Sequence, residues 1–232
     1  MSAMGIQVIN QSDQLDATET RRIAQACHIQ LQRDVAKAWD IASPLSVGVA
    51  NRPGWYRCYF VDTIPEAPGA LAYHDIDDDG TPYMKVGVTE TLSNGDTISS
   101  AASHETVELQ CDIFCQEWSY SSELQHLVAT EACDPVQSQS YRIRVGDGTF
   151  VPVSNFVTPY YFVDADRGKP LDYQRTLVEP FSITEGGYRI DMRAGAVKNT
   201  YAKGYPRKKK QQIAVGHGRT FWRHVTMALA MR

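Results

Sequence analysis

The chain has 232 residues, of which 43% are hydrophobic, and it carries 23 Lys and Arg against 27 Asp and Glu. This length fits one large domain or one domain with an extension, since domains commonly run to about 100–200 residues, and the composition excludes a fully disordered chain. A membrane-spanning helix is also excluded, because no apolar run approaches the ~18 residues that a span needs. The opening residues lack the charged-then-apolar pattern of a signal peptide, so we expect a cytoplasmic protein.

Residues Ala17–Ala42 predict one amphipathic helix, because apolar side chains recur at three- and four-residue steps before Pro44 ends the pattern. Four short runs rich in β-branched and aromatic residues follow, and each predicts a strand: Leu45–Ala50, Trp55–Val61, Gly69–His74 and Tyr83–Val88. The Asp-rich segment Asp75–Gly80 predicts the connection of a hairpin between the last two of these strands.

A second helix is predicted over Asp96–Phe114, with Asp96 or Thr97 as its N-cap. Residues 116–140 show a mixed pattern. Two further short runs, Tyr141–Val145 and Phe150–Val153, predict a hairpin around a Gly-Asp-Gly turn. The C-terminal segment contains one last stretch compatible with a helix, Thr220–Met231.

The order of helix, strands and helix favours an α+β fold. We expect a small twisted sheet covered by the long N-terminal helix and by the second helix, with an irregular C-terminal extension. The predicted division is a core over residues 1–153 and an extension over residues 154–232, aromatic at first and then basic, that packs on the core or on a partner.

The charge is distributed unevenly along the chain. Residues 189–232 contain eleven Lys and Arg and one acid, Asp191, and therefore carry a net charge of +10. Because the whole chain carries −4, the other 188 residues carry −14. This asymmetry indicates self-association or binding to another acidic protein through the basic segment, which includes Arg207–Lys210. Nucleic acid is the less favoured partner, because no aromatic residues are interleaved with these charges, and a membrane partner is not expected.

The predicted second helix contains a candidate metal site in Ser103–Glu108. Residues four apart share one face of a helix, so His104 and Glu108 could bind one ion together. Glu105 projects about 100° away from His104. That position suits a base that deprotonates a metal-bound water. The pattern is the His-Glu-x-x-His zinc helix with Glu in place of the second His.

A third ligand is expected from the segment Thr130–Pro135. Glu131 could complete the ligand set, and Asp134 could accept a hydrogen bond from the far side of a ligand, as carboxylates commonly do beside metal-bound histidine. Asp112 competes with Glu131, because it lies four residues beyond Glu108. Imidazole and carboxylate ligands suit zinc, whereas participation of Asp112 would favour a harder ion such as Ca²⁺ or Mg²⁺.

These residues resemble the zincin metallopeptidases whose third ligand is a Glu from a downstream helix. A wider likeness, over about 90 residues, is to zincin-like proteins of phages and prophages. The matching pieces occur in the same order in this chain: Tyr73-His74-Asp75, Pro82-Tyr83, Ser103–Glu108, Cys133-Asp134-Pro135 and Val153–Pro159. The resemblance implies a small zincin-type core and a viral or prophage origin.

Two functional hypotheses follow. In the first, the protein is a zinc-dependent hydrolase, with His104, Glu108 and Glu131 as ligands and Glu105 as the base, and its substrate is a peptide or protein. Two carboxylate ligands neutralise Zn²⁺, so such a site acidifies water less than neutral imidazoles would. In the second, the protein is a non-catalytic virion structural or assembly component, for example of a capsid, neck or tail, that retains a zincin-like core. The expected location is then the virion instead of the host cytoplasm.

Overall fold

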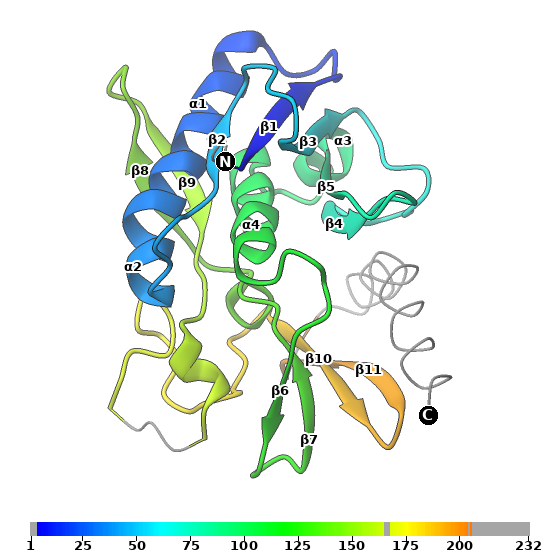
Figure 1. Ribbon diagram of the computed structural model, residues 1–232, viewed down its shortest axis with the longest axis vertical. Helices are drawn as coiled ribbons and strands as arrows, with labels where there is room; N and C mark the ends of the chain where they lie inside the picture. Colours follow the sequence, from blue (N-terminus) through cyan, green and yellow to red (C-terminus); the bar gives the residue numbers. More distant parts are fainter. Residues whose placement is uncertain (1–3, 165–167, 204, 206–232) are drawn as a thin grey trace.

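The computed structural model describes residues 4–164, 168–203 and 205. Within them the chain forms an α+β fold in which one long helix and one central helix pack between a five-stranded mixed sheet and a β-hairpin, with a second, antiparallel sheet at one end (Figure 1). The α+β class expected from the sequence is therefore confirmed. The predicted helix Thr220–Met231 and the basic run Arg207–Lys210 lie outside the described residues.

The five-stranded sheet has the strand order β2-β1-β3-β5-β4. Its strands are β1 (Gly5–Asn10), β2 (Ser46–Gly48), β3 (Tyr56–Val61), β4 (Ala72–Ile76) and β5 (Pro82–Gly87). Neighbouring strands are parallel except for β4, which runs antiparallel to β5 and forms an edge of the sheet. The four predicted strands and the β4–β5 hairpin are confirmed, although β4 lies slightly later than predicted.

The long N-terminal helix spans 23 residues without interruption, from Ala17 to Trp39. It consists of α1 (Ala17–Ile29), a π-helical segment (Gln30–Val35) and α2 (Ala36–Trp39). Asp16 caps it by accepting hydrogen bonds from two backbone N–H groups of the first turn. The helix ends before the predicted Ala42, because Asp40 adopts a left-handed conformation with φ 52°.

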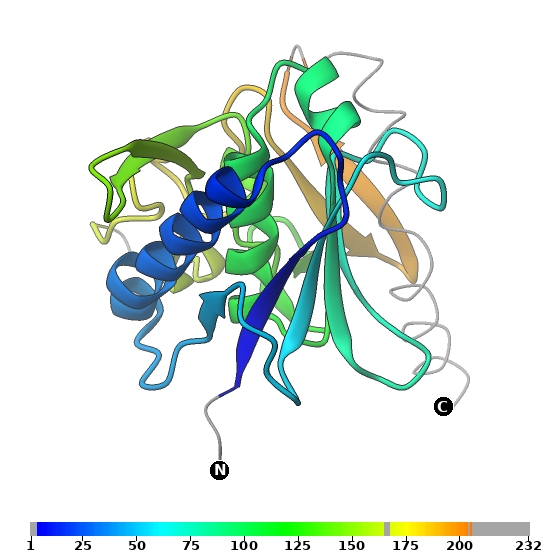
Figure 2. The ribbon, with the colours of Figure 1, turned by 90° about the horizontal axis from the view of Figure 1, so that it is seen from above.

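The second helix, α4 (Ile98–Cys111), begins after Thr97, whose hydroxyl accepts a hydrogen bond from the Ser100 backbone as predicted. It is shorter than the predicted helix, because Asp112 leaves the helical conformation. A separate short helix, α3 (Val88–Ser93), precedes it. Figure 2 shows α1 and α4 on the same side of the five-stranded sheet. Most α4 side chains are buried, which makes α4 the central helix of the fold.

The opposite side of α4 is covered by the predicted hairpin, formed by β8 (Ser140–Arg144) and β9 (Phe150–Ser154). The second sheet is antiparallel and has the order β11-β10-β7-β6. Its strands are β6 (Trp118–Ser121), β7 (His126–Ala129), β10 (Tyr188–Arg193) and β11 (Ala196–Tyr201).

The region expected to be an irregular extension contains regular structure. It supplies β10 and β11, and β10 pairs with β7, which comes from the predicted core. Its aromatic residues Phe156, Tyr161 and Phe181 belong to the largest buried cluster, together with residues of the first sheet and of both long helices. Among the described residues, no helix has the length and apolar character needed to cross a membrane.

Candidate metal centre

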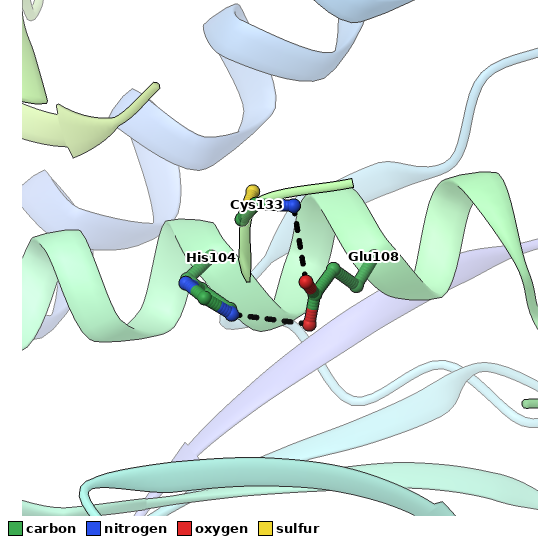
Figure 3. A group of neighbouring side chains, drawn as sticks. All are labelled: His104, Glu108 and Cys133. Atoms are coloured by element: carbon green, nitrogen blue, oxygen red, sulfur yellow. Dashed lines mark hydrogen bonds and ion pairs between the residues drawn. The ribbon is translucent and has the colours of Figure 1, made fainter. Parts of the chain in front are cut away.

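One turn of α4 presents an imidazole and a carboxylate to the same point. The Nε2 atom of His104 lies 3.1 Å from the Oε2 atom of Glu108. The other oxygen, Oε1, accepts a hydrogen bond from the backbone nitrogen of Cys133 at 3.0 Å. Figure 3 shows this arrangement, with the Glu108 carboxylate between the His104 ring and the Cys133 backbone. Because Oε1 is held by the backbone, Oε2 stays directed at the imidazole.

The segment that follows β7 supplies further acidic groups. Asp134 begins a short 3-10 turn (Asp134–Val136), and its Oδ1 atom lies 3.2 Å from Nε2 of His104. Burial and the Asp134 charge raise the pKa of the Tyr188 hydroxyl, on β10, well above its ordinary value. The sequence predicts that Asp134 accepts a hydrogen bond from the far side of a metal ligand. The structure instead places its carboxylate beside Nε2 of His104. His104 therefore lies between the carboxylates of Glu108 and Asp134.

The structure also brings Glu131 to this cluster. One oxygen from each of Glu108, Glu131 and Asp134 lies within 4.8 Å of the others, and all three residues are buried. Of the predicted ligands, Glu108 therefore lies with His104 in one group and with Glu131 in another, and none of the three groups among the described residues joins His104 with Glu131.

Glu105 projects from the same turn toward the five-stranded sheet. Its Oε2 atom lies 2.8 Å from the Nδ1 atom of His74, which is on β4. Both side chains are nearly inaccessible to solvent. Glu105 is therefore beside the His104–Glu108 pair, as its helical position predicts, and a buried hydrogen bond fixes its orientation.

Two site residues were missed as ligand candidates. His74 lies 3.7 Å from Glu108 through Nδ1 and 3.9 Å from Glu131 through Nε2. Cys133 joins His104 and Glu108 in a group whose ligand atoms lie within 4.8 Å of one another. Sequence spacing on one helix could not indicate either residue. The only signal was their presence in the short pieces of the phage-protein resemblance.

Asp112 lies at the C-terminal end of α4. Its Oδ2 atom accepts a hydrogen bond from the backbone of Glu117 at 2.8 Å, which holds the turn that leads to β6. Asp112 does not belong to any of the three groups of neighbouring ligand atoms among the described residues. The observed contact is that of a loop-stabilising residue.

The buried His and Glu residues form groups that could hold a metal ion. There are three such groups among the described residues, and all three include Glu108: His104 with Glu108 and Cys133, His74 with Glu105 and Glu108, and Glu108 with Glu131 and Asp134. The Oε2 atom of Glu131 is buried and accepts no hydrogen bond from a described residue, whereas Oε2 of Glu108 faces His104 Nε2 at 3.1 Å. Buried acceptors rarely lack a donor, so the Glu131 oxygen fits a cation.

The local electrostatics also favour a cation. Burial acts to raise the pKa of Glu108, but His104 and His74 outweigh it and hold this pKa at about 2. Burial and the Glu108 charge both raise the pKa of Glu131 well above its ordinary value. Burial opposes the protonation of His104, yet the Glu108 and Asp134 carboxylates raise its pKa well above the ordinary value. Without a metal, the cluster therefore retains protons that a bound cation would displace.

No protein-family model, no curated protein and no solved structure matches the chain. The resemblance to zincin-like proteins remains an expectation from short motifs.

Proposed function

We propose that the protein is a metal-dependent hydrolase that uses zinc to cleave peptide bonds. One observation carries this proposal: His104 and Glu108, one helical turn apart, converge to 3.1 Å beside the Asp134 carboxylate in a buried cluster. Around an ion with bonds of about 2.0–2.2 Å, ligand atoms lie roughly 3–3.5 Å apart. The separations from His104 Nε2 to Glu108 and to Asp134 agree with that spacing.

The donor set favours zinc among divalent ions. His104 offers a nitrogen ligand. Glu108 offers an oxygen ligand, and either Asp134 or Glu131 offers a second one. Zinc accepts both ligand types at tetrahedral positions. When bound, the ion supplies Lewis-acid chemistry, which polarises a carbonyl group and lowers the pKa of a water molecule. A carboxylate-rich ligand set weakens this effect, so the expected hydrolysis is slow.

Glu105 is the proposed base. It lies one residue from His104 on the helix, and its carboxylate takes a proton from the attacking water and passes it to the leaving nitrogen. The hydrogen bond from His74 Nδ1, at 2.8 Å, holds this carboxylate in one orientation. His74 is thus a positioning residue in this mechanism. Glu108 and Asp134 both approach the Nε2 atom of His104, so they would be its neighbours in the ligand set.

The edge of the five-stranded sheet supports a peptide substrate. β4 carries His74 and pairs with β5 on one side, and no described strand pairs with it on the other. An open strand edge offers backbone donors and acceptors to an extended peptide. Because β4 packs against α4, a peptide bound along this edge would run beside the cluster.

The test compares purified full-length protein with its Glu105→Gln variant. By elemental analysis, we expect at least one tightly bound zinc ion per chain in both proteins. We expect the wild type to hydrolyse a peptide library and the variant to lose this hydrolysis. The matched control is Glu123→Gln, since Glu123 is an exposed acid outside the cluster. Zinc-free wild type after incubation with zinc, or equal hydrolysis by the Glu105→Gln variant, would refute the proposal.

A second candidate function is a non-catalytic, metal-stabilised structural protein. The burial of the cluster favours it: the side chains of Glu108 and His74 are 0% and 2% exposed, and those of His104 and Glu131 only 14% and 11%. So little exposed surface limits the access of substrate. Bound zinc that raises the melting temperature, without any peptide hydrolysis, would decide for this function.

A further inference from the structure

His74, Glu105 and Glu108 form a second group of ligand atoms on the sheet side of α4. Their atoms lie within 4.8 Å of one another, and all three residues are buried. We propose that this group is a second divalent-cation position, which shares Glu108 with the position at His104. This inference rests on the proposed function, because it assigns a regulatory ion to the same site.

The distances suit coordination. His74 Nδ1 lies 2.8 Å from Glu105 Oε2 and 3.7 Å from Glu108 Oε2. These values bracket the separation of roughly 3–3.5 Å between ligand atoms around an ion with bonds of about 2.0–2.2 Å. All three ligand atoms lie within 4.8 Å of one another. One imidazole and two carboxylates form a ligand set that zinc accepts.

The two imidazoles define two positions. Among the described residues, none of the three groups of neighbouring ligand atoms contains both His74 and His104. Both rings nevertheless approach the same oxygen, Glu108 Oε2, at 3.7 Å and 3.1 Å. A carboxylate that lies between two ligand sets can bridge two ions, which in two-metal sites are about 3.5–4 Å apart.

The charge of the cluster matches two divalent cations. It contains four buried carboxylates, those of Glu105, Glu108, Glu131 and Asp134. With neutral imidazoles, one divalent ion would balance only half of their charge when all four are ionised. Uncompensated buried charge is costly, so the other half must be balanced by retained protons or by a second divalent ion that displaces them.

The far side of the His74 ring faces an acidic group. Its Nε2 atom lies 3.9 Å from Oε2 of Glu131. Metal-bound histidines usually donate their other ring N–H to such an acceptor, which fixes the tautomer. Nδ1 is then left facing Glu105 and Glu108.

Occupation of this second position would regulate the proposed reaction. Glu105 cannot take a proton from water while its carboxylate binds an ion, so the second cation is inhibitory. We therefore expect hydrolysis to rise as the first equivalent of zinc binds and to fall as the second binds. The lower affinity belongs to the second position, because Glu108 is already engaged by the first ion.

The experiment measures bound zinc per chain by calorimetric titration and elemental analysis of the full-length protein. The test variant is His74→Asn, because the Asn amide nitrogen keeps a donor near the place of Nδ1 but cannot bind a metal. The control is His28→Gln, which removes an imidazole from α1 outside the cluster. Circular dichroism and thermal unfolding confirm that each variant is folded.

The second position is supported if the wild type and His28→Gln each bind two equivalents of zinc and His74→Asn binds one. One equivalent in the wild type would overturn it while leaving the proposed function intact, as would two equivalents in a folded His74→Asn variant. Zero equivalents in the wild type would overturn the proposed function itself. If His74→Asn does not fold, Glu105→Gln provides the same stoichiometric test, with one equivalent expected.

Discussion

The two oxygens of Glu108 have different partners, and this difference organises the cluster. Oε1 is held by the Cys133 backbone at 3.0 Å, so the carboxylate cannot rotate freely. Oε2 is left between His104 and His74. A single helical residue thereby links the segment after β7 to both imidazoles. Its replacement by Gln would keep the size of the side chain but remove the charge that both imidazoles face.

The metal-free protein is predicted to lose stability as the pH rises from about 5 to 8. Burial and the Glu108 charge raise the pKa of Glu131. When the pH exceeds the ordinary pKa of a Glu side chain, the unfolded state has released a proton that the folded state still holds. The free energy of unfolding therefore falls as the pH rises. Burial opposes protonation of both imidazoles. Glu108 and Asp134 nevertheless raise the pKa of His104 well above its ordinary value, and Cys115, Glu105 and Glu131 do the same for His74. The stabilising contribution of both imidazoles is present below about pH 6.5 and is lost at higher pH.

Thermal unfolding of chelator-treated protein across this pH range tests the prediction. Below about pH 4.5 the trend reverses, because the pKa of Glu108 is lowered to about 2 and its stabilising charge is lost as the pH falls toward that value. Zinc should remove the loss above pH 5, since it binds the deprotonated groups. A metal-free melting temperature that rises steadily from pH 5 to 8 would contradict the account.

The sequence identified those site residues that share a helix face or a short segment. His104, Glu105 and Glu108 could be predicted together, because helical spacing alone relates them. Glu131 and Asp134 could be proposed from their chemistry. His74 could not be assigned, because its place beside Glu105 depends on how β4 packs against α4, which no local pattern encodes.

At the scale of elements, α4 depends on its N-terminal cap. Thr97 Oγ1 accepts the Ser100 N–H at 3.2 Å, which satisfies a donor that the first turn otherwise leaves unpaired. Thr97→Ala should lower the free energy of unfolding by about 1 kcal/mol. Urea unfolding checks this value, with the exposed Thr63→Ala as the control. Bound zinc should be unchanged, so a variant that loses zinc while remaining folded would show that the cap also positions His104.

The elements that the sequence missed have identifiable physical causes. β1 is buried along most of its length between β2 and β3, so it shows no alternation of polar and apolar residues. β10 does alternate, with Tyr188 and Ile190 buried between charged residues. Its charged residues fall within the basic segment 189–232, whose composition predicts an extension instead of a strand. The pairing of β10 with β7 is a long-range contact that composition cannot reveal.

At the scale of the whole molecule, the C-terminal part of the described chain supports the site. Gly187, directly before β10, packs against the turn that contains Asp134: a Cβ atom there would overlap the Pro135 carbonyl and come within 3.0 Å of the Asp134 carbonyl. Tyr188, the next residue, lies close enough to Asp134 for its charge to raise the pKa of the Tyr188 hydroxyl, together with burial. The position of Asp134 therefore depends on a segment more than fifty residues away in the sequence.

Gly187→Ala is predicted to weaken zinc binding and to destabilise the fold by about 1–3 kcal/mol, because the new methyl group must displace backbone atoms. The control is Gly48→Ala, since a Cβ atom at Gly48 meets no atom within 4 Å. Urea unfolding and zinc titration are the measurements. Unchanged stability and affinity in Gly187→Ala would show that the C-terminal segment does not hold Asp134 in place.

The most direct measurement is an anomalous difference map, collected at the zinc edge, from a crystal of the zinc-loaded full-length protein. The account predicts a peak about 2.0–2.1 Å from the Nε2 atom of His104, at bonding distance from Oε2 of Glu108. An ordered cluster with no peak beside these two atoms, and zinc bound only elsewhere on the chain, would contradict it.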